Sequence, residues 1–407
     1  MRSSIDLGPA FPFVSEALRN EKVFLYQRTE QGAVLAVGEH ERLEQPRFRG
    51  HRASDWCFGH MSYAQRHPAF GLPSPPTANN AWPIERWFVP EWVLQWKDDR
   101  VLLHTLPWCE EHALQVVAAM QRSSPGALAP LPILWEPKVR RAEYLQQARR
   151  LMEHIQRGDI YEVNYCMERT ASAPDFDPFR AFERLAASTR APFASFYRLE
   201  NLFALCASPE RFLRFDGSSV FAEPMKGTRP RSPDPVKDER LKQELASDGK
   251  ERSENVMALD VVRHDLSCIA TERSVVVEEL CAVRSYPRVH QLVSKVRATV
   301  KDRNSPMDVV AACFPMASMT GAPKRRAMQL IADVEEGDRG LYSGTLAHFA
   351  PDGSGELNVI IRTVLFDSES ALLSLSTGSA LTAQCDPLTE WEECELKARS
   401  VIDAMNA

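Results

Sequence analysis

The sequence predicts an α+β fold built on large, mostly antiparallel β-sheets. Two observations support this prediction. Strand-like segments follow one another through short turns, as in hairpins, and long segments with helical periodicity separate the groups of strands. No internal repeat of fixed period is present, which argues against a solenoid or a propeller. At 407 residues, the chain can form two or three domains, or one large domain with an N-terminal part.

The N-terminal part contains short strand-like runs and a tryptophan-rich segment, AWPIERWFVPEWVLQW, at 81–96. Large aromatic residues spaced along an apolar segment are typical of a buried core, although a binding platform is the alternative. The segment SSPGALAPLP at 123–132 has the composition of a linker. We therefore predict an N-terminal α/β portion at 1–130, packed on the core, and a second domain at 131–407.

A helix, a strand and a hairpin are predicted next along the chain. Segment 141–159 repeats apolar residues at helical spacing and reaches Gly158, so we predict a helix that ends there. Segment 160–169 alternates as a strand does. Segment 202–227 predicts a strand followed by a hairpin with its turn at 216–217, which puts Lys226 at the end of a sheet strand.

The C-terminal half combines helices and strands. Residues 238–270 have a helical pattern, with Val256, Leu259, Val262 and Leu266 on one apolar stripe. Segments 341–350 and 357–366 predict strands on either side of the turn PDGSG, and 371–382 predicts another. Segment 390–406 predicts the closing helix.

Charge and composition exclude several classes of function. The chain carries 49 Lys and Arg against 55 Asp and Glu, a net charge of −6 without long runs of one sign, so no nucleic-acid surface is predicted. The N-terminus has no apolar signal region and no apolar stretch approaches the ~18 residues of a membrane span, so we expect a cytoplasmic protein that does not enter membranes. Nine cysteines without C-x-x-C spacing predict reduced, buried thiols.

Two pairs of glutamates are spaced three residues apart: Glu251 and Glu254 in DGKERSEN, and Glu390 and Glu393 in DPLTEWEEC. On a helix this spacing puts both side chains on one face, where each pair can simply be solvated. If the two pairs face each other, however, a divalent cation has to lie between them, and all-oxygen ligation suits Mg²⁺.

Lys226, in EPMKGTRPR at 223–231, is either a surface charge or a reactive amine. Gly227 permits close backbone approach, Thr228 offers a hydroxyl and Arg229 can hold an anion. A lysine whose charge is disfavoured by burial or by nearby cations becomes a free amine, and hence a nucleophile.

Three further positions can contact a ligand. Arg362 interrupts an apolar strand and needs a partner, which is either a ligand carboxylate or a protein carboxylate. The turn SMTGAPKRRAM at 318–328 is either a plain helix entry or a cradle for an anionic oxygen, with Lys324 adding charge. Gly378 ends or kinks a strand where a ligand or another backbone comes close.

Eight segments occur in a fixed order between about residues 140 and 405: GDIYEVN, SPERF, MKGTRPR, KERSENVMALDVVRHD, TGAPKRRAM, RGLYSG, IIRT and DPLTEWEEC. Together they resemble the chorismate-binding enzymes, which include the anthranilate, isochorismate, salicylate and aminodeoxychorismate synthases. The resemblance implies a sandwich-like core flanked by helices, as in the anthranilate synthase large subunit.

The lysine before Gly-Thr is similar to that of component I of the aminodeoxychorismate synthases, whereas anthranilate and isochorismate synthases have alanine there. The resemblance implies that Lys226, as a neutral amine, attacks C2 of chorismate while Glu210 protonates the departing C4 hydroxyl. Ammonia then attacks C4 and expels the lysine. Glu162 occupies the position of the water-activating lysine of isochorismate and salicylate synthases, which speaks against water as the attacking group.

The resemblance also implies the remaining site residues and the cofactor. Mg²⁺ is expected at Glu254 and Glu393, with Glu251 and Glu390 next to these ligands. The pyruvyl carboxylate of chorismate is expected at Arg362 and Tyr342. The full set of expected substrate-binding residues is Gly227, Thr228, Thr320, Tyr342, Arg362, Gly378, Ser379 and Lys397.

The sequence departs from the family pattern at two positions of the site. Gln291, just after His290, stands where the family has a histidine, and Ala380 stands where it has a second glycine. The lost histidine fits an enzyme that retains the enolpyruvyl group. A glutaminase loop, G-x-C-x-G-x-Q, is absent, so ammonia is expected from a separate glutamine amidotransferase subunit or from solution. The alternatives are anthranilate synthase component I and an inactive relative that binds the glutaminase.

Overall fold

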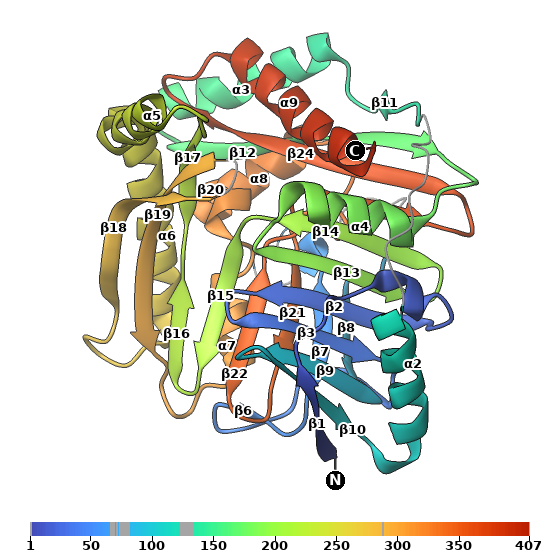
Figure 1. Cartoon of the computed structure of the whole chain (residues 1–407). Coiled ribbons are helices and arrows are strands. Elements are labelled where there is room, and N and C mark those ends of the chain that lie inside the picture. Colours follow the sequence, from blue (N-terminus) through green and yellow to red (C-terminus); the bar gives the residue numbers. More distant parts are fainter. Residues whose placement is uncertain are drawn as a thin grey trace.

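Two large β-sheets and the helices around them make up the computed structural model of the chain (Figure 1), which describes residues 2–65, 70, 72, 82–122, 133–286 and 289–406. One sheet has twelve strands among these residues and the other has ten. All pairings between their strands are antiparallel, as the sequence predicts.

The twelve-stranded sheet runs through both halves of the chain. In spatial order its strands are β1 (Ser3–Pro9), β10 (Arg100–Thr105), β9 (Trp92–Lys97), β3 (Gly32–Val37), β2 (Val23–Thr29), β13 (Phe193–Leu199), β14 (Leu202–Ser208), β23 (Thr363–Asp367), β24 (Leu372–Thr382), β12 (Glu162–Ser172) and β11 (Glu136–Pro137), and β20 (Gly321–Ala322) pairs with β12.

The ten-stranded sheet also draws on both halves. In spatial order its strands are β17 (Met225–Pro230), β19 (Val289–Thr299), β16 (Ser219–Ala222), β15 (Arg211–Asp216), β22 (Ser354–Asn358), β21 (Thr345–Phe349), β7 (Cys57–Met61), β8 (Glu85–Val89) and β4 (Glu41–Leu43), and β18 (Val276–Ser285) pairs with β19. A separate short hairpin joins β5 (Phe48–Arg49) to β6 (Arg52–Ala53).

The helices lie on the outer faces of the two sheets (Figure 1). The α-helices are α2 (Glu110–Arg122), α3 (Arg141–Gln156), α4 (Pro178–Thr189), α5 (Pro235–Ser247), α6 (Gly249–Ile269), α7 (Pro306–Cys313), α8 (Lys324–Val334) and α9 (Pro387–Asn406), and the short 3-10 helices are η1 (Ser15–Leu18), η2 (Tyr63–Gln65), η3 (Pro107–Cys109) and η4 (Ala317–Met319). None of the helices in the described part of the chain is long and apolar enough to cross a membrane.

The two sheets pack face to face through an apolar layer. In this layer Leu25, Tyr197 and Leu365 of the twelve-stranded sheet are buried together with Phe58 and Leu346 of the ten-stranded sheet. Other apolar clusters join α2, α4 and α9 to the outer face of the first sheet, and α6 and α7 to the outer face of the second. The predicted sandwich-like α+β core flanked by helices is confirmed.

The N-terminal residues complete both sheets. Strand β2 pairs with β13, and β7 pairs with β21, so hydrogen bonds join this part of the chain to the later strands. Four tryptophans of the tryptophan-rich segment are buried in the core, as predicted: Trp82, Trp87, Trp92 and Trp96. The predicted boundary at 123–132 lies outside the described residues.

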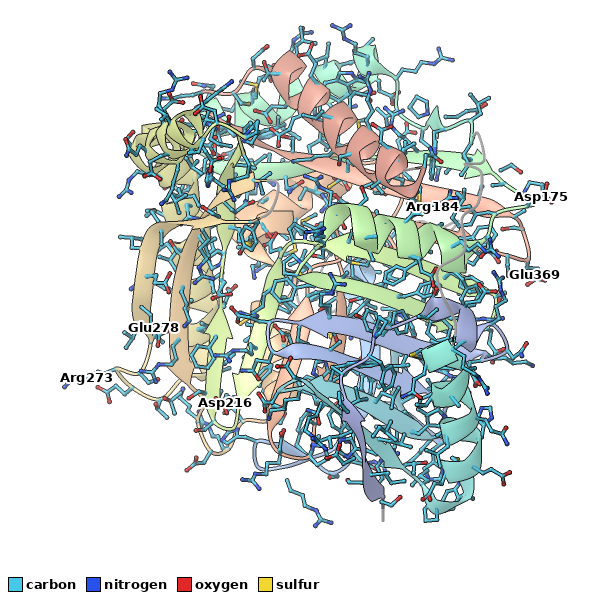
Figure 2. All side chains as sticks on the ribbon, in the orientation of Figure 1. Asp175, Arg184, Asp216, Arg273, Glu278 and Glu369 are labelled. Atoms are coloured by element: carbon cyan, nitrogen blue, oxygen red, sulfur yellow. The ribbon has the colours of Figure 1, made fainter. Side chains whose placement is uncertain are left out.

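The predicted hairpin is confirmed, with Asp216 of β15 paired to Ser219 of β16. Figure 2 shows Asp216 at the tip of this hairpin. The helices predicted at 141–159 and 390–406 and the strand predicted at 371–382 are also present, as α3, α9 and β24.

Residues 238–270 are mostly helical, as predicted, and they belong to two helices, α5 and α6. Asp248 has an extended backbone between α5 and α6, and its side chain accepts hydrogen bonds from the backbone N–H groups of Lys250 and Glu251. These bonds cap α6 at its N-terminus, because the first N–H groups of a helix have no partner within it. Val256, which the prediction placed on the apolar stripe, is 44% exposed.

The prediction of one strand at 357–366 is wrong, because the start of this segment belongs to one sheet and its end belongs to the other. Strand β22 ends at Asn358 in the ten-stranded sheet, and β23 begins at Thr363 in the twelve-stranded sheet. The chain crosses from one sheet to the other between them, and Arg362 has a left-handed φ of +53° at this crossing. An apolar run shows that a segment is buried, but it does not show which sheet each half joins.

Candidate active site

A bulge in β17 aims the side chain of Lys226. Lys226 pairs with Leu292 of β19, and Thr228 pairs with the next residue, Gln291, so Gly227 is the extra residue of the bulge. Lys226 is therefore the second residue of β17, whereas the sequence predicted that it ends the hairpin strand that became β16. Gly227 has a φ of +79°, which glycine adopts at little cost.

We expect Gly227→Ala to destabilise the protein by about 1–3 kcal/mol, because alanine is strained at a left-handed φ. Its Cβ would also lie 2.8 Å from Glu251 Oε2 and 3.0 Å from Glu251 Cβ. Urea unfolding followed by circular dichroism measures the loss. Gly217→Ala is the matched control, since Gly217 has a φ of +58° with nothing within 4 Å of the added Cβ. If both variants lose the same free energy of unfolding, the contact between the added Cβ and Glu251 does not contribute to the loss in Gly227→Ala.

The ammonium of Lys226 is paired with a carboxylate. Its side chain is 12% exposed, and Nζ donates to Glu162 Oε1 in an ion pair. Burial lowers the pKa of Lys226, but the negative charges of Glu162, Glu254 and Glu210 more than offset it, so the pKa lies above its ordinary value. In this structure the lysine faces carboxylates, whereas the sequence hypothesis invoked nearby cations. Attack by a neutral amine therefore requires that Lys226 first lose a proton.

Glu210 lies between β14 and β15, is buried, and interacts electrostatically with Lys226. Burial raises the pKa of Glu210 to about 7, against the opposing effects of a hydrogen bond from Ser318 and the positive charges of Lys226 and Lys397. Ser318 Oγ donates that bond to Glu210 Oε1 at 2.7 Å. A carboxyl group with this pKa keeps a proton near neutral pH and can donate it. Ser318 is a part of the site that sequence reasoning missed.

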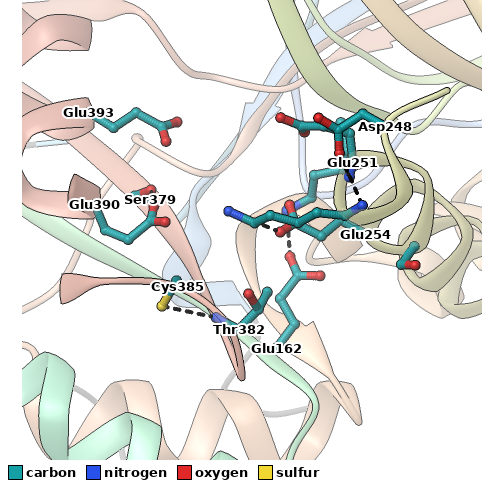
Figure 3. A network of polar contacts seen from close by, with 12 residues as sticks. Glu162, Asp248, Glu251, Glu254, Ser379, Thr382, Cys385, Glu390 and Glu393 are labelled. Atoms are coloured by element: carbon teal, nitrogen blue, oxygen red, sulfur yellow. Dashed lines mark hydrogen bonds and ion pairs between the residues drawn. The ribbon is translucent and has the colours of Figure 1, made fainter. Parts of the chain in front are cut away.

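The four glutamates of the predicted metal site lie on two helices that face each other. Figure 3 shows Glu251 and Glu254 of α6 on one side of a space, and Glu390 and Glu393 of α9 on the other. Burial raises the pKa of Glu254 to about 7. Burial also raises the pKa of Glu390, whose carboxylate accepts a hydrogen bond from Ser379 Oγ. Burial therefore disfavours the charged form of both carboxylates.

Lysines reach both glutamate pairs. Lys250 Nζ lies 3.8 Å from Glu254 Oε1, and Lys397 Nζ lies 2.6 Å from Glu393 Oε1. In the described part of the chain, no three His, Cys, Asp or Glu side chains are close enough together to hold a metal ion. The donors are carboxylates alone, and this chemistry fits Mg²⁺. Because no three of them gather in the described residues, oxygens from another source would have to complete such a site.

Tyr342 acts electrostatically on Arg362. Burial lowers the pKa of Arg362, and the smaller effects of Tyr342 and Glu393 oppose it. Its Nη1 donates to Ser400 Oγ at 2.8 Å, and it forms no ion pair with a carboxylate of the described residues. Tyr342 is buried, and burial holds its pKa well above the ordinary range. Of the two partners predicted for Arg362, the ligand carboxylate is the one that fits this arrangement.

Several predicted ligand-binding groups are used by the protein itself. Thr320 is fully buried, and its hydroxyl donates to Met316 O at 3.0 Å. Lys324 donates to Asp265 at 2.6 Å, so its charge is neutralised and the proposed role in an anion cradle is wrong. Arg229, predicted to hold an anion, forms an ion pair with Asp248 at 2.7 Å.

The strand that carries Gly378 packs tightly against its neighbour. A Cβ at Gly378 would lie 2.6 Å from Cys166 Sγ of β12, so the close approach predicted there is made by the protein's own strand. Lys397 Nζ donates to Gly378 O at 2.8 Å, and Ser379 is buried beside Glu390. Thr228, in contrast, is exposed.

His290 is turned into the protein and cannot substitute for the histidine missing at Gln291. Its side chain is 1% exposed, and it hydrogen-bonds Ser285 Oγ at 2.8 Å and Asp238 Oδ1 at 3.1 Å. Gln291, next along β19, pairs with Thr228 beside the bulge.

Comparisons with known proteins found similar sequences. The model of the chorismate binding enzyme family matches residues 10–403. Aminodeoxychorismate synthase of Streptomyces griseus is 41% identical over 261 residues, 64% of this chain and 36% of that protein. Aminodeoxychorismate synthase component 1 of Escherichia coli K12 is 32% identical over 312 residues, 77% of this chain and 68% of that protein.

The fold also resembles that of solved structures. Anthranilate synthase component I from Streptococcus pneumoniae superposes with a TM-score of 0.78 at 19% identity, covering 98% of this chain and 92% of that one. The chain spans only about a third of the length of some curated relatives, such as the Streptomyces griseus protein.

Proposed function

The chain belongs to the family of chorismate-binding enzymes, and from this membership we propose that it converts chorismate and ammonia to 4-amino-4-deoxychorismate. The observation that carries the proposal is the placement of a buried lysine, Lys226, within the electrostatic influence of a carboxylic acid, Glu210, whose pKa is about 7. Relatives named aminodeoxychorismate synthase support the same reaction.

Lys226 and Glu210 divide the first half of the reaction between them. The amine of Lys226 attacks C2 of chorismate, the two ring double bonds shift, and the bond from C4 to the hydroxyl oxygen breaks. Glu210 gives its proton to that oxygen, which leaves as water, because hydroxide itself is a poor leaving group. Ammonia then attacks C4, the double bonds shift back, and the bond from C2 to Lys226 breaks.

Two other groups of residues hold the substrate in this proposal. Arg362 and Tyr342 bind the pyruvyl carboxylate, since the guanidinium of Arg362 has no carboxylate partner in the described part of the chain. Glu254 and Glu393 hold Mg²⁺, with Glu251 and Glu390 beside them. When bound, Mg²⁺ neutralises the ring carboxylate of chorismate. The carboxylate oxygens of chorismate would complete a site that the glutamates alone leave too open.

We also propose the cytoplasm as the site of action and a glutamine amidotransferase subunit as the source of ammonia. The Escherichia coli relative is named as component 1 of its enzyme, which supports a partner subunit. The match to the Streptomyces griseus relative covers about a third of that protein.

Product analysis tests the proposal. Incubation with chorismate, Mg²⁺ and an ammonium salt is expected to yield a compound that retains its enolpyruvyl group and gives p-aminobenzoate when a lyase is added. Removal of Mg²⁺ with EDTA should abolish turnover, and added Mg²⁺ should restore it. A fluorescent aromatic product without any lyase would instead identify an anthranilate synthase, and the absence of chorismate turnover would identify an inactive relative.

A further inference from the structure

We propose that Glu162 is the base that takes a proton from the ammonium of Lys226 before the attack on chorismate and returns it when the lysine is released. This inference rests on the proposed function and extends it. An ammonium has no lone pair, so the paired lysine of this structure has to lose a proton before it can act as a nucleophile.

The fold fixes Glu162 next to Lys226 although 64 residues separate them in the sequence. Glu162 is the first residue of β12, where it pairs with Thr382 of β24 on one side and Ala322 of β20 on the other. Its side chain is 5% exposed and accepts a hydrogen bond from Lys226 Nζ. The backbone of Glu162 is therefore fixed by a strand on each side, and its carboxylate lies against Lys226 Nζ and away from water, as a direct proton transfer requires.

The other acidic groups that act on Lys226 have different tasks in the proposed reaction. They are Glu254 of α6, Glu393 of α9, and Glu210 between β14 and β15. In the described part of the chain none of these three hydrogen-bonds Lys226 Nζ. Glu210 has to start the cycle protonated, since it supplies the proton to the C4 hydroxyl. Glu162 is thus the carboxylate that is both in contact with Nζ and free to accept its proton.

The proton balance of the full reaction closes with these two carboxyl groups. At the start Lys226 is an ammonium, Glu162 is ionised and Glu210 is protonated. After the attack at C2, Glu162 holds the proton from Lys226, Glu210 is ionised, and water has left. After ammonia has attacked C4, Glu210 takes a proton from the new C4 ammonium, and the released amine of Lys226 takes its proton back from Glu162. The enzyme returns to its starting state, and one ammonia replaces one water.

Glu162→Gln tests the inference, because the amide oxygen can still accept a hydrogen bond from Lys226 but cannot accept a proton. We expect the rate of product formation at about pH 6 to fall by about 10²-fold or more. The ratio of the variant rate to the wild-type rate should then rise as pH rises, because the unassisted lysine loses its proton to solvent more readily at higher pH. Taking the ratio at each pH cancels the titration of Glu210, which both proteins share.

Two further variants complete the test. Glu162→Asp keeps a carboxylate, so the ratio of its rate to the wild-type rate should be below one and should not change with pH. This variant also tests the inference if Glu162→Gln fails to fold. Glu168→Gln is the control on the same strand. It removes the charge that pairs with Lys138, its amide oxygen can still accept the hydrogen bond from Ser374 Oγ, and it should leave the rate unchanged. A pH-independent loss in Glu162→Gln, or a pH-dependent one in Glu162→Asp, would overturn the inference alone. A wild-type protein that forms no 4-amino-4-deoxychorismate would overturn the proposed function and the inference together.

Discussion

Lys226→Ala is expected to lower the rate of 4-amino-4-deoxychorismate formation by on the order of 10³-fold. The side chain is buried where chorismate is expected to bind, and a held amine replaces dissolved ammonia in the first bond-forming step. Without it, ammonia has to displace the C4 hydroxyl of chorismate with no covalent intermediate. Steady-state assays coupled to a lyase measure the loss.

The unfolding of Lys226→Ala has to be measured beside its activity, because removing Lys226 leaves Glu162 buried without its partner. Lys138→Ala provides a matched control, since it also removes a lysine that pairs with a glutamate of β12, but at a partly exposed site. The control should keep full activity. If Lys226→Ala unfolds at the same urea concentration as the wild type and forms product at the wild-type rate, the covalent route is ruled out.

Glu210→Gln is expected to reduce the rate by about 10²- to 10⁴-fold, the range for loss of a general acid. The sign of the pH dependence follows from the pKa of Glu210, which burial raises to about 7. Below this pH the carboxyl group holds the proton that the C4 hydroxyl needs, and above it the proton is lost. The wild-type kcat/KM should therefore fall as pH rises through about 7, and Glu210→Gln should lack this decline.

Ser318→Ala sharpens the test of Glu210. The hydrogen bond from Ser318 Oγ lowers the pKa of Glu210, so its removal should move the decline in kcat/KM to higher pH while most activity remains. A decline at an unchanged pH in Ser318→Ala, or one that persists in Glu210→Gln, would assign the acid to another residue.

The fold class could be predicted because hairpin turns and helical periodicity are local signals. The turn at Asp216 is an example, since its two strands pair as the sequence indicates. The break between α5 and α6 also has a local signal that the prediction passed over. An Asp followed three residues later by a Glu, as in Asp248 and Glu251, is typical of a helix N-terminus. The helical spacing of apolar residues continues on both sides of Asp248, so this spacing alone does not indicate a break.

The partner of Lys226 could not be predicted, because it depends on how two sheets meet. Strand β17 belongs to the ten-stranded sheet and β12 to the twelve-stranded one, and only their packing brings Lys226 and Glu162 together. The positions of Lys226, Glu210 and the glutamate pairs followed from the family motifs. The charge on Lys226 did not, because a pKa depends on groups that are distant in sequence.

Mass spectrometry of the enzyme stopped during turnover tests the central claim most directly. The protein is mixed with chorismate and Mg²⁺ without ammonia, denatured rapidly and digested. We predict that the peptide containing Lys226 gains the mass of chorismate less one water, that the lysine carries this addition, and that ammonia removes it when added before denaturation. Product formation at the normal rate with Lys226 unmodified at every time point would contradict the account.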